Sequence, residues 1–169
     1  MPKSETYEIL IEMPEGETRR LHIAWSRAHW INQGPIRDTI PVNGGAMPIA
    51  YGFVIGTRVS EGPGKVDELD ALVYSRRKFS VGERTRARPI ASIRLENGDH
   101  KVVFADDTVK AERWADIPEA KRKLVLEYFG YKSRVEGVGD REDALELIRS
   151  CITDNPLPIP ESTDVRSEG

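Results

Sequence analysis

At residues 65–74 the chain reads Lys65-Val66-Asp67-Glu68-Leu69-Asp70-Ala71-Leu72-Val73-Tyr74. Asp67 and Asp70 stand three positions apart, directly before an apolar run that is typical of a buried strand. Two carboxylates at the mouth of such a strand suit a divalent cation, because hard cations such as Mg²⁺ bind carboxylate oxygens, waters and phosphate oxygens. The stretch therefore predicts a strand with a metal site at its start.

Short strands continue on both sides of this stretch. Residues 7–13 alternate, which places Tyr7, Ile9 and Ile11 on one face of a strand. Many short strands followed by helices predict a mainly β protein with some α, namely a small closed β-barrel, OB-like, with two helices packed outside. The predicted strands cover residues 7–13, 21–25, 51–55, 69–74, 90–95 and 102–105.

Two helices follow the strands. Asp116 is predicted to cap a helix over residues 117–129, and Glu119 to complete a capping box. A second helix is predicted to begin after Asp140, with acidic residues in its first turn. The predicted buried faces are Ile117, Ala120, Leu124 and Tyr128 in the first helix, and Ala144, Leu147, Ile148 and Cys151 in the second.

Length and composition predict one ordinary soluble domain. The chain has 169 residues, of which 38% are hydrophobic and 31% charged. We expect a single domain over residues 1–153. The Pro-rich, polar segment 154–169 is predicted to be a disordered C-terminal tail.

Charge and cysteine content argue against several classes of protein. The net charge of −3 argues against a general affinity for nucleic acid or anionic membranes. The single cysteine, Cys151, excludes a disulfide framework, and it forms no zinc-binding pattern with the three histidines. No apolar run approaches the roughly 20 residues that span a bilayer. The first residues lack the apolar core of a signal peptide, so we expect a cytoplasmic protein.

A second group of polar residues follows later in the chain. The turn at residues 95–101 carries Glu96, Asp99 and Lys101, and the pair Tyr131-Lys132 follows the first predicted helix. Acids, lysines and tyrosine hydroxyls together suit phosphoryl transfer, in which cations neutralise phosphate oxygens and a carboxylate takes a proton from water. Each motif alone has a simpler structural interpretation. Acids on loops commonly bind backbone amides, and a lysine commonly closes a helix.

These residues, in this order, resemble the soluble family I inorganic pyrophosphatases. That family has an Asp-x-Asp-Pro-x-Asp signature after an Asn-Tyr-Gly-Phe-like strand, then an Arg-Pro-Ile-Gly strand, an Asp-rich turn closing on Lys, and a His-Tyr-Lys after a helix. The resemblance covers residues 7 to 152. The counterparts are Ala50-Tyr51-Gly52-Phe53, Arg88-Pro89-Ile90-Ala91, Asp99 with Lys101, and Gly130-Tyr131-Lys132, with Ile11-Glu12-Met13-Pro14 near the start and Val135-Glu136-Gly137-Val138 near the end.

The resemblance implies a pyrophosphatase fold and the Mg²⁺-dependent hydrolysis of inorganic pyrophosphate to two phosphates, by a homo-oligomer. Asp67 would be the general base for the attacking water. The implied metal ligands are Asp70, Asp99, Glu96 and Glu12, and the implied substrate-binding residues are Arg20, Tyr51, Lys101, Tyr131 and Lys132.

Lys65 departs from the family pattern, because it stands where the signature has its first Asp. An ammonium at a metal site repels the metal, and the loop before it, residues 59–64, is longer than is usual for the family. Glu61 is then a candidate replacement ligand. Two alternatives stay open: a non-catalytic relative that binds a phosphorylated ligand or partner protein, and a hydrolase of an organic diphosphate.

Two further features admit more than one interpretation. The basic run Arg76-Arg77-Lys78 suits a nucleic-acid surface if aromatic residues such as Trp25 and Trp30 stack on bases, but a solvated loop is the simpler interpretation. We interpret Trp25 and Trp30 as core or subunit-contact residues.

Overall fold

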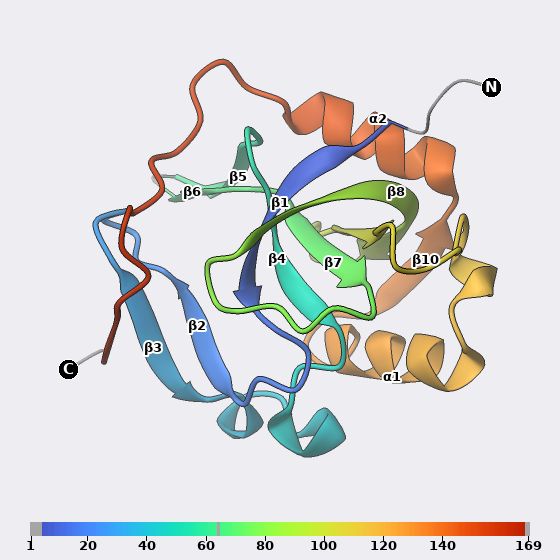
Figure 1. Ribbon diagram of the computed structural model, residues 1–169, viewed down its shortest axis with the longest axis horizontal. Helices are drawn as coiled ribbons and strands as arrows, with labels where there is room; N and C mark the ends of the chain where they lie inside the picture. The colour runs from blue at the N-terminus through green and yellow to red at the C-terminus, as the bar shows by residue number, and fades with distance from the viewer. Residues whose placement is uncertain (1–4, 64, 168–169) are drawn as a thin grey trace.

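The computed structural model describes residues 5–63 and 65–167, without the side chains of residues 61 and 65. Its elements, shown in Figure 1, are eleven strands, two α-helices and three short 3₁₀ helices. The strands are β1 Tyr7–Met13, β2 Arg19–Ile23, β3 Trp30–Pro35, β4 Ala50–Val54, β5 Val59–Gly62, β6 Lys65–Asp67, β7 Asp70–Tyr74, β8 Arg84–Leu95, β9 Lys101–Ala105, β10 Val135–Gly139 and β11 Val165–Ser167. The helices are η1 Ile36–Asp38, η2 Val42–Gly45, η3 Trp114–Asp116, α1 Glu119–Phe129 and α2 Arg141–Cys151.

The main sheet closes on itself through the long strand β8. The strand order is β1-β4-β7-β9-β8-β10, and β8 also pairs with β1. Residues 84–87 of β8 face β1, whereas the stretch from Arg88 to Ile93 faces β9, with a register shift between Pro89 and Ala91. This closed ring of strands, with two α-helices outside, confirms the mainly β fold predicted from the sequence.

Apolar residues fill both sides of the sheet. Along β7, Ala71 and Val73 pack in the cluster that includes Ala144 and Ile148 of α2. Leu72, which points the other way, packs in the cluster that includes Tyr128 of α1. A strand buried on both faces has no polar alternation. This explains why residues 71–74 are apolar without interruption.

Helix α1 begins later than the sequence predicts. Pro118 is its N-cap residue, and Ile117 before it is extended at ψ 136°. A residue that precedes proline is disfavoured in the helical region, which delays the helix to Glu119. The predicted cap Asp116 therefore belongs to η3, where its carboxylate accepts the backbone N–H of Glu112 at 3.0 Å.

The later start also changes which face of α1 is buried. Ala120, predicted to be buried, is exposed, and Leu124 is only half-buried. The buried residues of this helix are Val125, Tyr128 and Phe129. In α2 the prediction is closer: Asp140 caps the helix by accepting the N–H of Asp143, and the buried residues are Ala144, Leu145 and Ile148, while Leu147 and Cys151 are partly buried.

The C-terminal segment, for which composition predicts disorder, lies against the protein as far as the structure describes it. Residues Val165–Ser167 form β11 and pair in parallel with β3, on the side of β3 opposite β2. Figure 1 shows this segment running from α2 to the edge of the molecule at β3. Ile159 and Val165 pack against a cluster centred on Trp30, which is 1% exposed. The polar composition of the segment did not predict these few apolar contacts.

No helix in the described part of the chain is long and apolar enough to cross a membrane.

Gly52 allows β4 to lie against β1. A Cβ atom at this position would overlap the carbonyl oxygen of Leu10. We therefore expect Gly52→Ala to lower the free energy of unfolding by about 3 kcal/mol in urea denaturation. Gly137→Ala on β10 is the control, since its Cβ meets nothing within 4 Å. A Gly52→Ala protein as stable as the Gly137→Ala protein would contradict this packing.

Asp143 ties α2 to β8. Its carboxylate accepts two bonds from Arg94, at 3.0 and 2.8 Å, and one from the Ser92 hydroxyl. The Arg94 and Ser92 hydrogen bonds lower the pKa of Asp143. The resulting stability is present above the unfolded-state pKa of about 3.9 and is lost as pH falls through the lower folded-state pKa.

We expect Asp143→Asn to destabilise the protein by about 1–2 kcal/mol at pH 7, because a charge-assisted bidentate pair is lost. The difference from wild type should shrink in urea titrations below about pH 4. Glu142→Gln changes a neighbouring acid in the same helical turn and serves as the control. A difference between Asp143→Asn and wild type that does not depend on pH would contradict this interpretation.

Candidate active site

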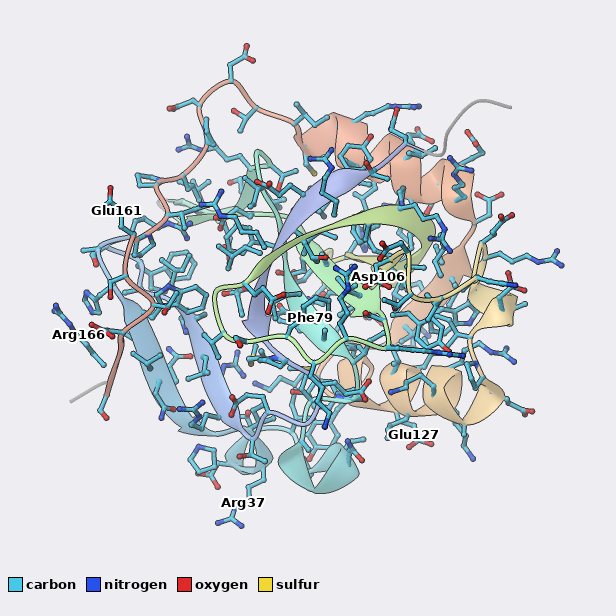
Figure 2. The ribbon with its side chains drawn as sticks, viewed as in Figure 1. Arg37, Phe79, Asp106, Glu127, Glu161 and Arg166 are labelled. Atoms are coloured by element: carbon cyan, nitrogen blue, oxygen red, sulfur yellow. The ribbon has the colours of Figure 1, made fainter. Side chains whose placement is uncertain are left out.

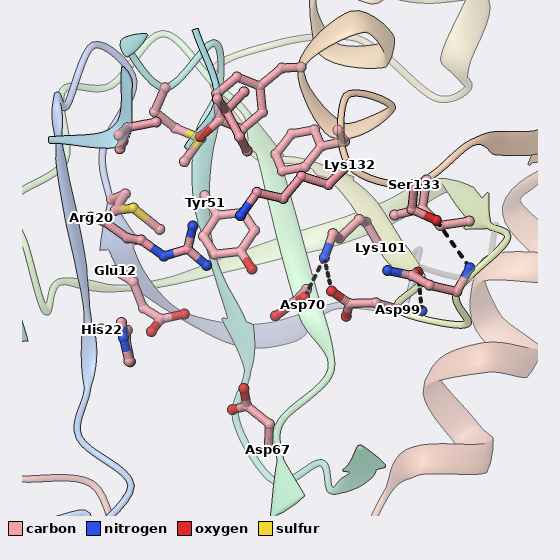
Figure 3. A pocket seen from close by; sticks show the side chains of 18 residues that line it. Glu12, Arg20, His22, Tyr51, Asp67, Asp70, Asp99, Lys101, Lys132 and Ser133 are labelled. Carbon is pink, nitrogen blue, oxygen red and sulfur yellow. Dashed lines mark hydrogen bonds and ion pairs between the residues drawn. The ribbon is translucent and has the colours of Figure 1, made fainter. Parts of the chain in front are cut away.

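A cavity of about 200 Å³ lies where the ends of several strands meet (Figure 3). Strands β1, β2, β4, β6, β7, β8 and β9 and the helix α1 all contribute side chains to it. Its lining residues are Glu12, Met13, Arg20, His22, Ile36, Ile40, Met47, Tyr51, Asp67, Asp70, Leu95, Asn97, Asp99, Lys101, Tyr128, Phe129, Lys132 and Ser133. The cavity thus collects polar residues that lie far apart in sequence, as sites commonly do.

Acidic side chains crowd one part of the cavity. Asp67 comes from the end of β6, Asp70 from the start of β7, and Glu12 from β1. Burial raises the pKa of Glu12 well above its usual range, and Asp70 and Asp67 raise it further. Burial also raises the pKa of Asp70 to about 7, against the opposing effect of Lys101. The charged forms of these two carboxyl groups are therefore costly in the buried cavity.

Lys101 is the cation at the centre of this region. Its Nζ lies 2.6 Å from Asp70 Oδ2 and 2.9 Å from Asp99 Oδ2, and the residue is 5% exposed. Burial alone would lower the pKa of Lys101, but Asp70 and Asp99 together raise it. Lys101 is therefore a buried ammonium that bridges two carboxylates, as the dashed lines in Figure 3 show.

Tyr51 lies beside Lys101 in the lining of the cavity. Its ring stacks on Phe129, with centroids 5.8 Å apart, and the Lys101 Nζ lies 5.8 Å from the Tyr51 centroid. Burial, followed by the charge of Asp70, raises the pKa of Tyr51 well above 10. Its hydroxyl therefore stays protonated and can donate a hydrogen bond at neutral pH.

Two further cations approach the cavity from different elements. Arg20 lies on β2, and its guanidinium comes within 3.5 Å of the Thr39 hydroxyl. Lys132 follows α1 and is exposed. Figure 3 shows its side chain reaching back over the cavity towards Tyr51, with Arg20 on the other side of that ring. Arg20, Lys101 and Lys132 are thus available to an anion that enters the cavity.

Two residues that the sequence assigns to the site do not line the cavity. Glu96 points to solvent and pairs with Arg134 at 3.1 Å, where both side chains are more than half exposed. Tyr131 is 54% exposed, because it follows the C-terminus of α1 on the outer side of the turn. As for Lys65, its backbone lies in β6 opposite Gly62, and its side chain and that of Glu61 lie outside the described part.

Several lining residues escaped sequence reasoning. His22 lies two positions after Arg20 on β2 and so shares its face, a signal that strand alternation could have given. Asn97 and Ser133 gave no such signal, because the hydrogen bond between them joins segments that are distant in sequence. The Ser133 hydroxyl accepts the Asn97 N–H at 3.0 Å, and the Asn97 side chain accepts the Asp99 N–H at 3.0 Å. This pair fixes the turn that carries Asp99.

The residues that line the cavity include the type of ligand that a divalent cation binds. Carboxylate oxygens are the ligands that Mg²⁺ prefers, and a cation would stabilise the charged form of Glu12, which burial and then the charges of Asp70 and Asp67 disfavour. As the described side chains stand, however, no three His, Cys, Asp or Glu groups are close enough to hold one ion. Lys101 instead occupies the space between Asp70 and Asp99.

A family comparison agrees with this combination of fold and site. The family model described as inorganic pyrophosphatase matches residues 9–155. The chain therefore belongs to the inorganic pyrophosphatase family.

Individual relatives give the same result. The inorganic pyrophosphatase of Haemophilus influenzae is 30% identical over 160 residues, covering 85% of this chain and 86% of its own length. That of Thermus thermophilus is 28% identical over 166 residues, covering 88% and 89%. Among solved structures, the inorganic pyrophosphatase of Ehrlichia chaffeensis superposes with a TM-score of 0.76 at 21% identity, covering 90% of this chain and 96% of that one. The structural match shows a shared fold.

The buried Lys101 pair should contribute strongly to stability. We expect Lys101→Met to lower the free energy of unfolding by about 3 kcal/mol or more, because it leaves Asp70 and Asp99 without their cation. Lys121→Met is the matched control, since Lys121 pairs with the exposed Glu15 at the surface and should cost about 1 kcal/mol or less. Urea denaturation measures both. Equal losses would show that the buried bridge is not a special contact.

Proposed function

We propose that this chain hydrolyses inorganic pyrophosphate to two phosphates with Mg²⁺ as cofactor. One observation carries the proposal: a single cavity brings acids from β1, β6 and β7 opposite cations from β2, β9 and the end of α1. The acids suit metal ions and proton transfer, and the cations suit phosphate oxygens. Membership of the family, and relatives named inorganic pyrophosphatase, support the choice of substrate.

In this proposal the cations bind and orient the substrate. Arg20 offers a planar fork that matches phosphate oxygens, and Lys132 offers a flexible point charge. The Tyr51 hydroxyl donates a further hydrogen bond, because its raised pKa keeps it protonated. Charge on the departing phosphate is stabilised by these donors and by Lys101.

Asp67 would accept the proton of the attacking water. Its Oδ1 already accepts the Glu68 backbone N–H at 2.8 Å, which holds the carboxylate in one orientation. A fixed carboxylate beside the substrate site is the geometry that general-base catalysis needs.

Glu12, Asp70 and Asp99 do not form one three-ligand group as they stand, so each would contribute a ligand separately to Mg²⁺. When bound, Mg²⁺ would supply positive charge to phosphate oxygens and lower the pKa of water. Neither Glu96 nor Tyr131 has a role in this proposal, because both point away from the cavity.

The proposal also covers the location, the oligomeric state and the partners of the protein. We propose a cytoplasmic homo-oligomer with a small-molecule substrate and with no nucleic-acid or membrane partner. The net charge of −3 supports the last point, because it offers no general attraction to polyanions. Trp25 is 54% exposed and is therefore not a core residue, so the subunit contact predicted for it stays part of this proposal.

One observation favours a second candidate, a protein that binds a phosphorylated ligand without hydrolysis. Lys101 already neutralises Asp70 and Asp99, as a metal ion would. A binder of this kind would hold its ligand in EDTA, whereas the proposed enzyme needs Mg²⁺ for turnover.

Asp67→Asn tests the proposed mechanism directly. The amide keeps the shape of the side chain but cannot accept the proton, so we expect phosphate release from pyrophosphate to fall by about a hundredfold or more. Asp38→Asn, an exposed acid on η1, should retain wild-type turnover. An Asp67→Asn enzyme with most of the wild-type activity would remove this residue from the role of general base.

Asp70→Asn tests the metal assignment. Because the cavity offers few carboxylates, we expect this change to weaken Mg²⁺ binding by about tenfold or more in calorimetric titrations. Asp107→Asn, on the surface, is the control. If Asp70→Asn binds Mg²⁺ as wild type does, the ion lies elsewhere.

A further inference from the structure

Glu68 lies between Asp67 and Asp70 in the sequence but does not line the active-site cavity. It is 4% exposed, and its Oε2 forms an ion pair with Arg27. Its Oε1 is buried without a hydrogen-bond partner among the described residues. Because the Glu68 backbone N–H is the group that orients Asp67, the placement of Glu68 determines the placement of Asp67.

Arg27 reaches Glu68 from a tight turn far away in sequence. The turn is closed by hydrogen bonds between Ala24 and His29 and between Arg27 and Ala24. Arg27 adopts φ +64°, a left-handed conformation that is uncommon for residues other than glycine. Its side chain is 12% exposed and donates from Nε to the Pro158 carbonyl oxygen at 2.9 Å.

The C-terminal segment in turn is fixed on both sides of Pro158. Before it, the Thr153 N–H donates to the Gly56 carbonyl at 3.1 Å, and Arg58 donates to the Asn155 carbonyl at 3.0 Å. After it, Ile159 packs in the Trp30 cluster, and β11 pairs with β3. Figure 2 shows Glu161 and Arg166 of this segment at the outer edge of the molecule, so its charged side chains face solvent while its backbone lies against the protein.

From these contacts we propose that Arg27, held by the C-terminal segment, is a positioning residue that fixes Glu68 and through it Asp67 for pyrophosphate hydrolysis. The proposal rests on the function proposed above. It also gives the segment after α2 a part in the active site, although none of its described residues lines the cavity.

The physical reason is the cost of leaving a buried carboxyl group without a partner. Without the guanidinium, Glu68 Oε2 would lose its ion pair, and Oε1 has no hydrogen-bond partner among the described residues. The residue would then shift or draw in water, and Asp67 would move with it. A displacement of about 1 Å at a reacting group reduces turnover by up to about a hundredfold.

Arg27→Asn tests the proposal, because asparagine tolerates the left-handed conformation and the turn is therefore preserved. With pyrophosphate and Mg²⁺, we expect kcat to fall on the order of 10- to 100-fold while KM stays within about threefold. Arg27→Lys should recover part of kcat, since it restores a cation but not the fork that reaches both Glu68 and Pro158.

Arg58→Ala is the matched control. Arg58 also donates to a backbone carbonyl of the C-terminal segment, but the ion pair of Glu68 is formed with Arg27 and not with Arg58. A kcat near wild type in Arg58→Ala, beside a reduced kcat in Arg27→Asn, supports positioning through Glu68. Equal losses in the two variants would show that Arg27 only anchors the segment and would overturn the proposal, as would a folded Arg27→Asn protein with wild-type kcat.

Amide hydrogen exchange gives a readout that does not depend on activity. Arg27→Asn should speed exchange at residues 67–69 and leave β4 and β9 unchanged, and Arg58→Ala should not affect residues 67–69. If wild type releases no phosphate, the proposed function fails by itself, and the exchange experiment still decides the role of Arg27. Unchanged exchange at residues 67–69 in Arg27→Asn would overturn that role.

Discussion

Buried negative charge is the constraint on which this structure depends. Glu12, Asp67 and Asp70, which are largely withdrawn from water, face one cavity together with the more exposed Asp99. Removing carboxylates from water is expensive unless each finds a cation or hydrogen-bond donors. Burial raises the pKa values of Glu12 and Asp70, so their charged forms are costly in this cavity even beside Lys101. A divalent cation would stabilise these charged forms.

Cations offset the buried acids in two places. Inside the cavity, Lys101 bridges Asp70 and Asp99 from the neighbouring strand β9, which pairs with β7 in parallel. Behind the cavity, Arg27 pairs with Glu68 and is itself held by the segment after α2. The closed sheet brings the first set together, and the C-terminal segment supports the second. Stability and the geometry of the proposed reaction therefore depend on the same ion pairs.

The sequence predicts what periodicity and local motifs encode. Residues 7–13 form β1 as alternation predicts, and Asp140 caps α2 as predicted. The resemblance to the family also named every Asp, Glu, Lys and Arg that lines the cavity. Long-range contacts are beyond such reasoning: no local pattern links Arg27 to Glu68, or predicts that Glu96 turns outward to Arg134. The disorder predicted for the C-terminal segment reflects the same limit, because two apolar anchors and three strand residues are too few to alter its composition.

The central claim is that this acidic cavity hydrolyses pyrophosphate with the help of Mg²⁺, and phosphate release by the wild-type protein tests it most directly. Purified protein is mixed with pyrophosphate in Mg²⁺, and in parallel in excess EDTA. The account predicts two phosphates released for each pyrophosphate consumed in Mg²⁺, and release at the uncatalysed rate in EDTA. Catalysed release that is the same in EDTA, or no catalysed release in Mg²⁺ from a folded protein, would contradict it.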